Sequence, residues 1–311
     1  MTARRFVESR RLIQSLAAVA VLAASPVSAE LGRGTSVDDW KGYGGVAAGG
    51  KGYVTAPMGQ LHYRDIGPRT TKHPIMLFHQ SPMSLVQWAE VQNALAELGY
   101  RTITLDTPGY GNSDQPAKQS TIGDYADNAV ALLDALKIDK VIVGGHHTGA
   151  QIATAFAARH GDRVVGIMVH GAAALTPEEA DVYLSNPNRR SRMPKGDGSH
   201  LQAFKPQTPP DSQEILNAKQ WNMLLSYVQG PDIGHYAAFH YDMFPDLKAI
   251  KVPGMVLSDT KDPINKQDKR VAALRPDWKY VEFSNGDLLQ FMAEPKRWAK
   301  IAADFAAPLQ K

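Results

Sequence analysis

The chain has no cysteine among its 311 residues. This absence excludes disulfide bonds, thiolate nucleophiles and metal sites built on thiolates. It is compatible with an oxidising compartment but does not by itself place the protein in one. Any catalytic or binding chemistry must therefore use other side chains.

The chain also lacks a strong excess of either charge once residues 1–29 are set aside. The full sequence has 34 basic and 31 acidic residues. Four arginines and one glutamate lie in residues 1–29, which leaves 30 of each sign in the remainder. A near-neutral body predicts no nucleic-acid partner and no anionic membrane surface. Hydrophobic residues make up 43% of the chain, enough for one large domain or for a core with a cap.

The apolar run near the N-terminus, Leu12–Ala24, is too short to span a bilayer comfortably. Arginines precede it, and the small residues Val27-Ser28-Ala29 follow it as a cleavage site. We therefore interpret residues 1–29 as a signal peptide, with a retained anchor as the alternative. The segment Ser9–Ile13, with its pair Arg10-Arg11, resembles a twin-arginine export signal. The protein is expected in the periplasm or outside the cell, with no membrane contact after the signal is removed.

Strand and helix patterns alternate along most of the remaining chain, after an irregular, glycine-rich arm over residues 30–51. This alternation predicts an α/β fold with a mostly parallel sheet and helices on both faces. The core is expected over residues 52–174 and 246–311, with a helical cap over residues 175–245. The expected strands are Gly52–Thr55, Gln60–Asp65, Pro74–Phe78, Arg101–Leu105, Lys140–Val143, Val164–Val169, Gly254–Ser258 and Lys279–Phe283. The expected helices are Ser84–Leu98, Ile122–Leu136, a segment ending near Arg159, Glu214–Tyr227 in the cap, and Pro295–Ala306.

One turn carries a motif with chemical meaning. The run Gly145-His146-His147-Thr148-Gly149 follows the strand ending at Val143 and precedes a helix. A strand, a Gly-x-X-x-Gly turn and a helix form the nucleophile elbow, which exposes residue X above the sheet. The glycines are required because backbone and helix approach too closely for a Cβ atom. Residue X is His147.

Three further motifs occur in the order typical of one family. The segments Leu77–Pro82, Leu105–Asp114 and Ser258–Pro263 resemble its oxyanion loop, its Asp-x-Pro-Gly-x-Gly-x-Ser segment and its acid loop. Residues 52 to 307 thus resemble the α/β-hydrolase superfamily, in the branch of epoxide hydrolases, haloalkane dehalogenases and small esterases. The resemblance implies a cofactor-independent hydrolase with a small-molecule substrate and its acid at Asp262. Fold alone does not establish activity.

The sequence departs from this family at three places. The elbow carries His147 in place of the nucleophile. The usual C-terminal base position holds Asp287 or Leu288, and the last histidine of the chain is His240, so no alignment restores that base. Gln80 stands in the oxyanion loop where glycine is usual. The standard triad is therefore absent.

Two interpretations remain. In the first, His147 acts as a general base or as a nucleophile forming an acyl-imidazole. Asp287 would stabilise the imidazolium, and Asp262 would assist or hold its loop. Gln80 and the Thr148 N–H would hold an oxyanion. The reaction most expected is hydrolysis of an ester or lactone, which the family resemblance implies. Proton-transfer chemistry, as in a lyase or isomerase, is the second expectation. In the second interpretation, the protein binds a small molecule and catalyses nothing.

Other polar residues at this rim are secondary candidates. Ser81 is a displaced nucleophile or a turn serine, and His79 is a substrate contact or a structural loop residue. No metal site is predicted. His79, His146 and His147 come from two loops, and adjacent elbow side chains are expected to point in different directions. The sequence leaves the oligomeric state open.

Overall fold

The computed structural model describes residues 49–185, 233–284, 286 and 289–311. Four parts of the sequence-based interpretation lie outside these residues. They are the signal peptide, most of the N-terminal arm, the central part of the cap with its expected helix Glu214–Tyr227, and the position occupied by Asp287 or Leu288. No helix in the described part of the chain is both long and apolar enough to cross a membrane.

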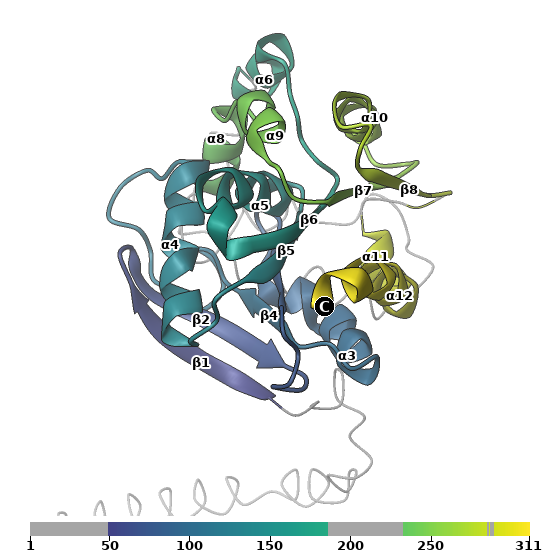
Figure 1. The fold of residues 1–311 in the computed structure, drawn as a ribbon. Helices are drawn as coiled ribbons and strands as arrows, with labels where there is room; N and C mark the ends of the chain where they lie inside the picture. The colour runs from purple at the N-terminus through teal and green to yellow at the C-terminus, as the bar shows by residue number, and fades with distance from the viewer. Residues whose placement is uncertain (1–48, 186–232, 285, 287–288) are drawn as a thin grey trace, which may run out of the picture. The chain divides into compact units, whose positions relative to one another are not determined.

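The core is an eight-stranded sheet in the order β1-β2-β4-β3-β5-β6-β7-β8 (Figure 1). The first two strands are antiparallel to each other, β2 is antiparallel to β4, and all other neighbours are parallel. The predicted mostly parallel α/β sheet is thus confirmed. The strands are β1 Gly49–Ala56, β2 Gly59–Ile66, β3 Ile75–Phe78, β4 Thr102–Leu105, β5 Val141–His146, β6 Val164–His170, β7 Gly254–Asp259 and β8 Lys279–Phe283.

The first strand begins earlier than the sequence suggested. Residues 49–51 belong to β1 and pair with β2, so the expected irregular arm is wrong at its last three residues. Strand β2 begins directly after the turn, at Gly59, whose φ of +112° favours glycine. Glycine-rich sequence predicted a loop, but ladder hydrogen bonds with β2 override that local preference.

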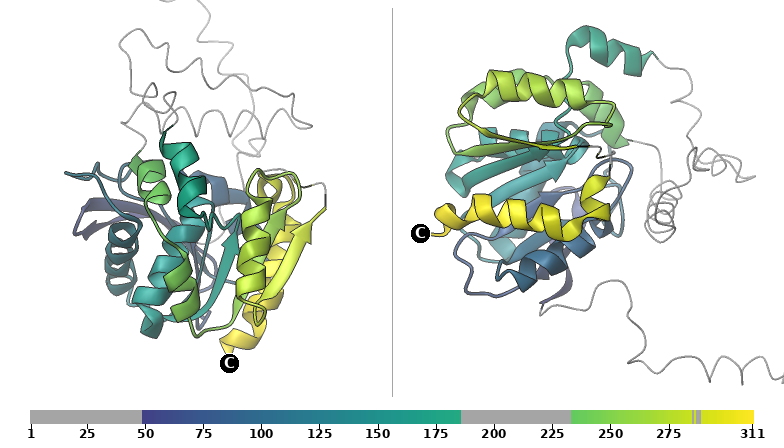
Figure 2. Two further views of the ribbon diagram at one scale, coloured as in Figure 1. Left: turned by 90° about the horizontal axis from the view of Figure 1, so that it is seen from above. Right: turned by 90° about the vertical axis from the view of Figure 1, so that its right-hand side faces the viewer.

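Helices cover both faces of the sheet, because the central strands are apolar on both sides (Figures 1 and 2). Along β3, Met76 and Phe78 face the cluster with α4 (Ile122–Ala135) and α5 (Thr148–Arg159). The alternate residues Ile75 and Leu77 face α3 (Ala89–Glu97) and α12 (Pro295–Ala306). This period of two fixes which side chains of each strand enter which half of the core.

Local sequence explains the helix ends near the core. Thr121 and Asp124 form a capping box at the start of α4, which fixes where that helix begins. The expected helix Ser84–Leu98 divides into a 3-10 turn, η2 (Leu85–Trp88), followed by α3. The remaining described elements are η3 Gly161–Arg163, α10 Asn265–Leu274, α11 Gln290–Ala293 and η6 Ala307–Gln310.

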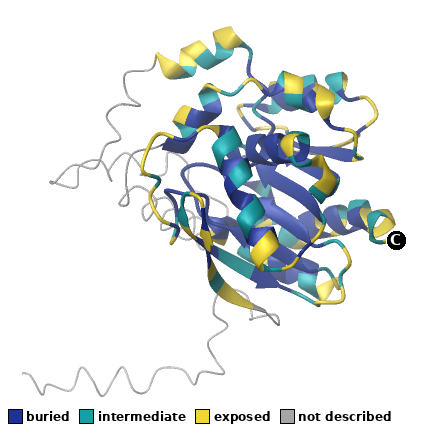
Figure 3. Ribbon diagram, turned by 60° about the vertical axis from the view of Figure 1, so that its left-hand side comes forward, coloured by how far each residue is buried: buried dark blue, intermediate teal, exposed yellow. Residues whose placement is uncertain are grey.

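The insertion expected as a cap lies between β6 and β7. Its described parts are α6 (Pro177–Leu184) and α8 (Ile233–Phe239), followed by α9 (Phe244–Ala249). No residue of α6 is buried, whereas the sheet strands are mostly dark blue in Figure 3. The side chains of Glu179 and Arg270 pair at 2.7 Å, which ties α6 to α10.

Candidate active site

The turn after β5 has the geometry of a nucleophile elbow. His147 lies between β5 and α5 with φ of 50° and ψ of −115°. A Cβ atom at Gly145 would lie 2.2 Å from the backbone of Gly149, and one at Gly149 would lie 2.2 Å from the Phe78 carbonyl oxygen. Only glycine fits at these two positions. A non-glycine residue in such a backbone conformation costs on the order of 1–3 kcal/mol, a strain typical of functional sites.

The imidazole of His147 pairs with Asp262, which follows β7. The two side chains are joined from Nε2 to Oδ2 at 2.7 Å. The His147 side chain is 23% exposed, and the Asp262 side chain is fully buried. Since an ionised carboxylate only accepts, His147 Nε2 donates this bond, and Nδ1 carries the lone pair of the neutral ring. Among the described residues, no group bonds to that nitrogen.

Asp262 is held as a carboxylate by its neighbours. Burial on its own raises the pKa of Asp262, but the bond from His147 and the N–H of Ile264, at 2.9 Å, outweigh it. The pKa of Asp262 therefore falls below its usual range. An ionised Asp262 stabilises an imidazolium at His147, so these two predicted residues form a dyad.

A second histidine–aspartate pair lies beneath the elbow. His170, at the end of β6, bonds through Nε2 to Asp259 at 2.9 Å, and both side chains are fully buried. The His146 ring lies between the two pairs, stacked on His147 at 4.3 Å and edge-on to His170 at 5.0 Å. His147 and His170 thus each pair with a separate carboxylate, Asp262 and Asp259.

A third carboxyl group is buried close by. Asp268, on α10, accepts a hydrogen bond from the Ala172 N–H at 2.5 Å. Burial raises the pKa of Asp268 well above its usual range, and the charges of Asp262 and Asp259 act in the same direction. The protonated form of Asp268 is thus favoured relative to that of Asp262, whose pKa is lowered.

The oxyanion loop supplies fewer side-chain contacts than the sequence suggested. His79 donates through Nδ1 to the Gln80 carbonyl at 2.8 Å and accepts through Nε2 from the Thr107 N–H at 2.9 Å. Both ring nitrogens are therefore engaged in holding the loop. The Gln80 N–H is also taken, by Gln87 at 3.3 Å. His79 thus stabilises the loop, and neither of its ring nitrogens is available to bind a substrate.

Two backbone N–H groups remain at this rim. In the described part of the chain, the N–H groups of Ser81 and Thr148 donate to no protein acceptor. Thr148 is the first residue of α5, where helix N–H groups lack partners within the helix. The Ser81 hydroxyl faces α8, since a Cβ at Gly234 would lie 2.0 Å from it. These two donors, rather than the His79 ring or the Gln80 N–H, are suited to an oxyanion.

The expectation that the adjacent elbow histidines point apart is wrong. The rings of His146 and His147 stack with an angle of 28° between their planes. One nitrogen from each ring and one oxygen of Asp262 lie within 4.8 Å of one another. Imidazole lone pairs lie in the ring plane, so nearly parallel rings direct them side by side and not at one point. The stacking therefore disfavours a chelate at this cluster.

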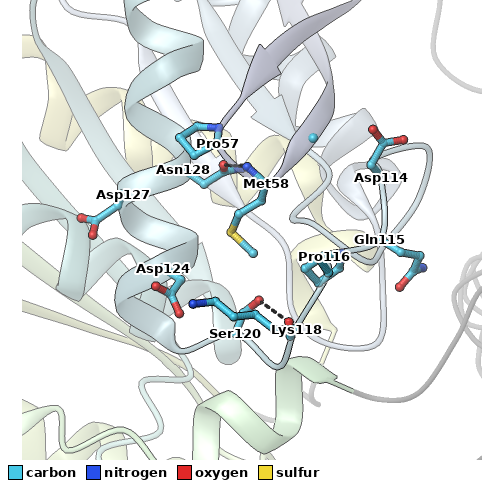
Figure 4. Close-up of a pocket in the computed structure, with 12 residues that line it drawn as sticks. Pro57, Met58, Asp114, Gln115, Pro116, Lys118, Ser120, Asp124, Asp127 and Asn128 are labelled. Carbon is cyan, nitrogen blue, oxygen red and sulfur yellow. Dashed lines mark hydrogen bonds between the residues drawn. The ribbon is translucent and has the colours of Figure 1, made fainter.

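A hollow lined by other described residues lies away from the elbow. A pocket of about 760 Å³ lies between the turn Pro57–Gly59, the loop Asp114–Ser120 and α4 (Figure 4). Its acidic residues serve local contacts: Asp124 caps α4, and Asp127 pairs with Arg159 at 2.8 Å. None of the predicted site residues lines it. The chemistry of the elbow and this hollow are therefore separate features.

Sequence reasoning identified His147 and Asp262, which the structure brings together, and Thr148 beside them. It missed the pair His170–Asp259, the buried Asp268 and Gly171. A histidine at a strand end, and a glycine directly after it, were the available signals. Asp287 lies outside the described residues, so its suggested contact with the imidazole stays a prediction.

The strand order, the elbow after β5 and the acid after β7 define the α/β-hydrolase class of fold. A family model described as alpha/beta hydrolase fold matches residues 73–209. The chain belongs to the α/β-hydrolase fold superfamily.

Individual relatives share about a quarter to a third of their aligned residues with this chain. An AB hydrolase superfamily protein, YisY, of Bacillus subtilis (strain 168) is 26% identical over 268 residues, 79% of this chain and 95% of that protein. An epoxide hydrolase of Caballeronia sordidicola is 34% identical over 146 residues, 44% of this chain and 42% of the relative.

Solved structures agree with the fold. A thermophilic esterase from Thermogutta terrifontis matches with a TM-score of 0.70 and 22% identity, over 84% of this chain and 99% of the other. The enol-lactonase from Burkholderia xenovorans LB400 matches with a TM-score of 0.67 and 25% identity, over 82% and 100% of the two chains.

Proposed function

We propose that this protein is an exported, cofactor-independent enzyme that hydrolyses a small ester or lactone, with His147 as general base. The observation that carries the proposal is the 2.7 Å bond from His147 Nε2 to buried Asp262. That bond orients the ring and leaves Nδ1 as the basic nitrogen at the exposed elbow. An esterase and an enol-lactonase among the structural neighbours support this substrate class.

The proposed reaction starts with a water molecule between His147 and the substrate carbonyl carbon. Nδ1 of His147 removes a proton as the water oxygen attacks, and the carbonyl oxygen becomes an oxyanion. The N–H groups of Ser81 and Thr148 are placed to stabilise that charge. Ionised Asp262 stabilises the imidazolium, which then returns the proton to the leaving alkoxide.

The test uses the mature protein with p-nitrophenyl esters and a panel of lactones. His147→Ala is expected to lower kcat by about 10²–10⁴-fold, the usual contribution of a general base. His160→Ala is the matched control, because His160 also pairs through Nε2 with an aspartate, Asp127, at 2.8 Å, but at the surface. Full activity in His147→Ala would refute the assignment of the base.

The base role and the nucleophile role can be separated. If His147 attacks the substrate through Nδ1, an acyl-imidazole accumulates, and rapid mixing shows a burst of p-nitrophenol. General-base catalysis gives no burst and a slower rate in deuterated water. A burst that hydroxylamine discharges would replace the base assignment with the nucleophilic one.

A second candidate is proton-transfer chemistry, as in a lyase or isomerase. The observation in its favour is that the elbow offers one base, with no separate nucleophile–base pair among the described residues. Single-base proton abstraction needs only this arrangement. Exchange of carbon-bound hydrogen for deuterium in candidate substrates, followed by NMR and lost in His147→Ala, would support it. Tight binding of a small molecule without turnover would instead support a binding protein.

Export is the remaining part of the proposal and rests on residues 1–29. The intact mass of the protein recovered from the periplasm or medium should correspond to a chain starting at Glu30. Replacing Arg10 and Arg11 by lysine should retain the unprocessed protein inside the cell if the twin-arginine route is used. Normal processing in that variant would refute this route.

A further inference from the structure

The residue that follows β6, Gly171, lies against the imidazole of His147. Gly171, directly after β6, has φ of +60°. A Cβ atom at this position would lie 2.4 Å from Cδ2 and 2.8 Å from Nε2 of His147, and 3.5 Å from Oδ2 of Asp262. Both ring distances are shorter than any real Cβ contact. The bare glycine therefore provides the space that the bonded ring occupies.

Hydrogen bonds hold the backbone of residues 170–172 in place. The carbonyl of His170 accepts the N–H of His147 at 3.0 Å, and the N–H of Gly171 donates to Leu257 at 3.2 Å. The N–H of Ala172 donates to the buried carboxyl of Asp268 at 2.5 Å. Three consecutive residues are thus tied to the elbow, to β7 and to α10. An added methyl group would displace the ring and not the backbone.

We propose that Gly171 is a positioning residue, whose missing side chain lets the His147 imidazole lie against the end of β6 and reach Asp262. The inference deepens the proposed function, because it concerns the same dyad. It also adds a requirement beyond the elbow motif itself. A large aromatic base at the elbow needs a glycine directly after the neighbouring strand as well as the two glycines of the turn.

Several titratable groups surround the ring and must be considered in any measurement. Asp262 bonds to it and His146 stacks on it. His170 pairs with Asp259, and the charges of Asp259 and Asp262 act on Asp268. A readout specific for the bond between His147 and Asp262 is therefore preferable to a pH profile alone.

The first experiment compares Gly171→Ala with Gly99→Ala by nitrogen-15 NMR of the histidine side chains. Gly99 has φ of +85° and open space around its missing Cβ, so its substitution reproduces the backbone strain without the collision. The wild-type protein and Gly99→Ala should show a protonated Nε2 on His147 with a hydrogen-bonded proton. Loss of that signal in Gly171→Ala is expected, and its persistence would overturn the inference.

The second experiment tests the same contact through stability. In the wild-type background, Gly171→Ala should lower Tm by more than Gly99→Ala does. In the His147→Ser background, the ring is gone and this extra loss should disappear, because double-mutant cycles isolate the pairwise contribution. An extra loss that stays equal in both backgrounds would mean that Gly171 serves the fold alone.

If the enzyme is active, Gly171→Ala should lower kcat by about 10²-fold, as small displacements of a catalytic group do, with KM nearly unchanged. A raised KM with normal kcat would contradict a positioning role. Failure of the proposed function has a different signature. An inactive wild-type protein that still shows the bonded proton, and loses it in Gly171→Ala, refutes the hydrolase proposal and supports this inference.

Discussion

Trp298 donates its indole N–H to Nδ1 of His170 at 3.1 Å, across the packing of α12 against the sheet. The acceptor nitrogen must be unprotonated, so Nε2 of His170 carries the proton and donates it to Asp259. A residue near the C-terminus thus sets the tautomer of a buried histidine at the end of β6. Since the His170 carbonyl also accepts the N–H of His147, α12 supports the site through His170.

Trp298→Phe is expected to lower the free energy of unfolding by about 2–3 kcal/mol. The change leaves the buried Nδ1 of His170 without its donor and opens a small cavity. Urea titration followed by circular dichroism measures the loss. Tyr100→Phe is the control, because the Tyr100 hydroxyl donates to a carbonyl of the same helix, Ala303, at 3.0 Å from a less buried position. Equal losses of unfolding free energy in the two variants would contradict a particular contribution of the bond from Trp298 to His170.

Asp262→Asn is expected to lower kcat for any substrate found by about 10²-fold or more, with KM little changed. An amide cannot stabilise an imidazolium as a carboxylate does, so the neutral form of His147 loses its driving force as a base. Steady-state kinetics measures the effect. Asp246→Asn is a suitable control, since Asp246 is a carboxylate that accepts a bond from Tyr241 at 2.5 Å away from the elbow. Similar losses in both variants would argue against the dyad.

The stability contributed by Asp262 should depend on pH in one direction. Its folded pKa lies below the value in the unfolded chain, which is about 3.9 for aspartate. The contribution is therefore fully present above that value and is lost as pH falls through the folded pKa. Compared with Asp262→Asn, the wild-type protein should lose stability as pH falls from about 5 to 3. A constant difference between the two proteins over this range would show that Asp262 is not stabilised as a carboxylate.

Glu179→Gln should loosen α6 from α10 and lower the free energy of unfolding by about 1 kcal/mol, the upper range for a partly exposed pair. Glu179 accepts two bonds from Arg270, at 2.7 and 2.9 Å, and these bonds lower its pKa to about 2. A depressed pKa means that the stabilisation is present at neutral pH and is lost as pH falls toward 2. Thermal unfolding of both proteins at pH 7 and pH 3 measures this change. No difference at pH 7 would contradict it.

Most of the fold was predictable because its signals are local. Apolar runs such as Ile75–Phe78 and Val141–Val143 read as buried strands, and the capping box at Thr121 marks the start of α4. The prediction failed at residues 49–51, where ladder bonds to β2 outweigh the glycine-rich composition. The helix after η2 was predicted as one continuous segment, because its periodicity does not distinguish 3-10 from α geometry.

The site was predictable only in part. His147 and Asp262 came from motifs, each read within a few residues of sequence. Their pairing joins residues 115 positions apart, and no short-range pattern reports such a contact. Local reasoning also expected the side chains of His146 and His147 to point in different directions. The packing of His170 and Phe291 around His146 instead brings its ring onto that of His147.

The sequence by itself determined that the elbow holds a histidine, that the chain beyond His240 has no histidine, and that thiol chemistry is absent. These facts exclude the usual triad and need no coordinates, because they follow from residue identity and order alone. Only the tertiary structure decided that Asp262 bonds to His147, why Gly171 must lack a side chain and which N–H groups of the described residues stay unpaired. The reason is physical: those properties depend on distances between strand ends that the sheet brings together, not on neighbours along the chain.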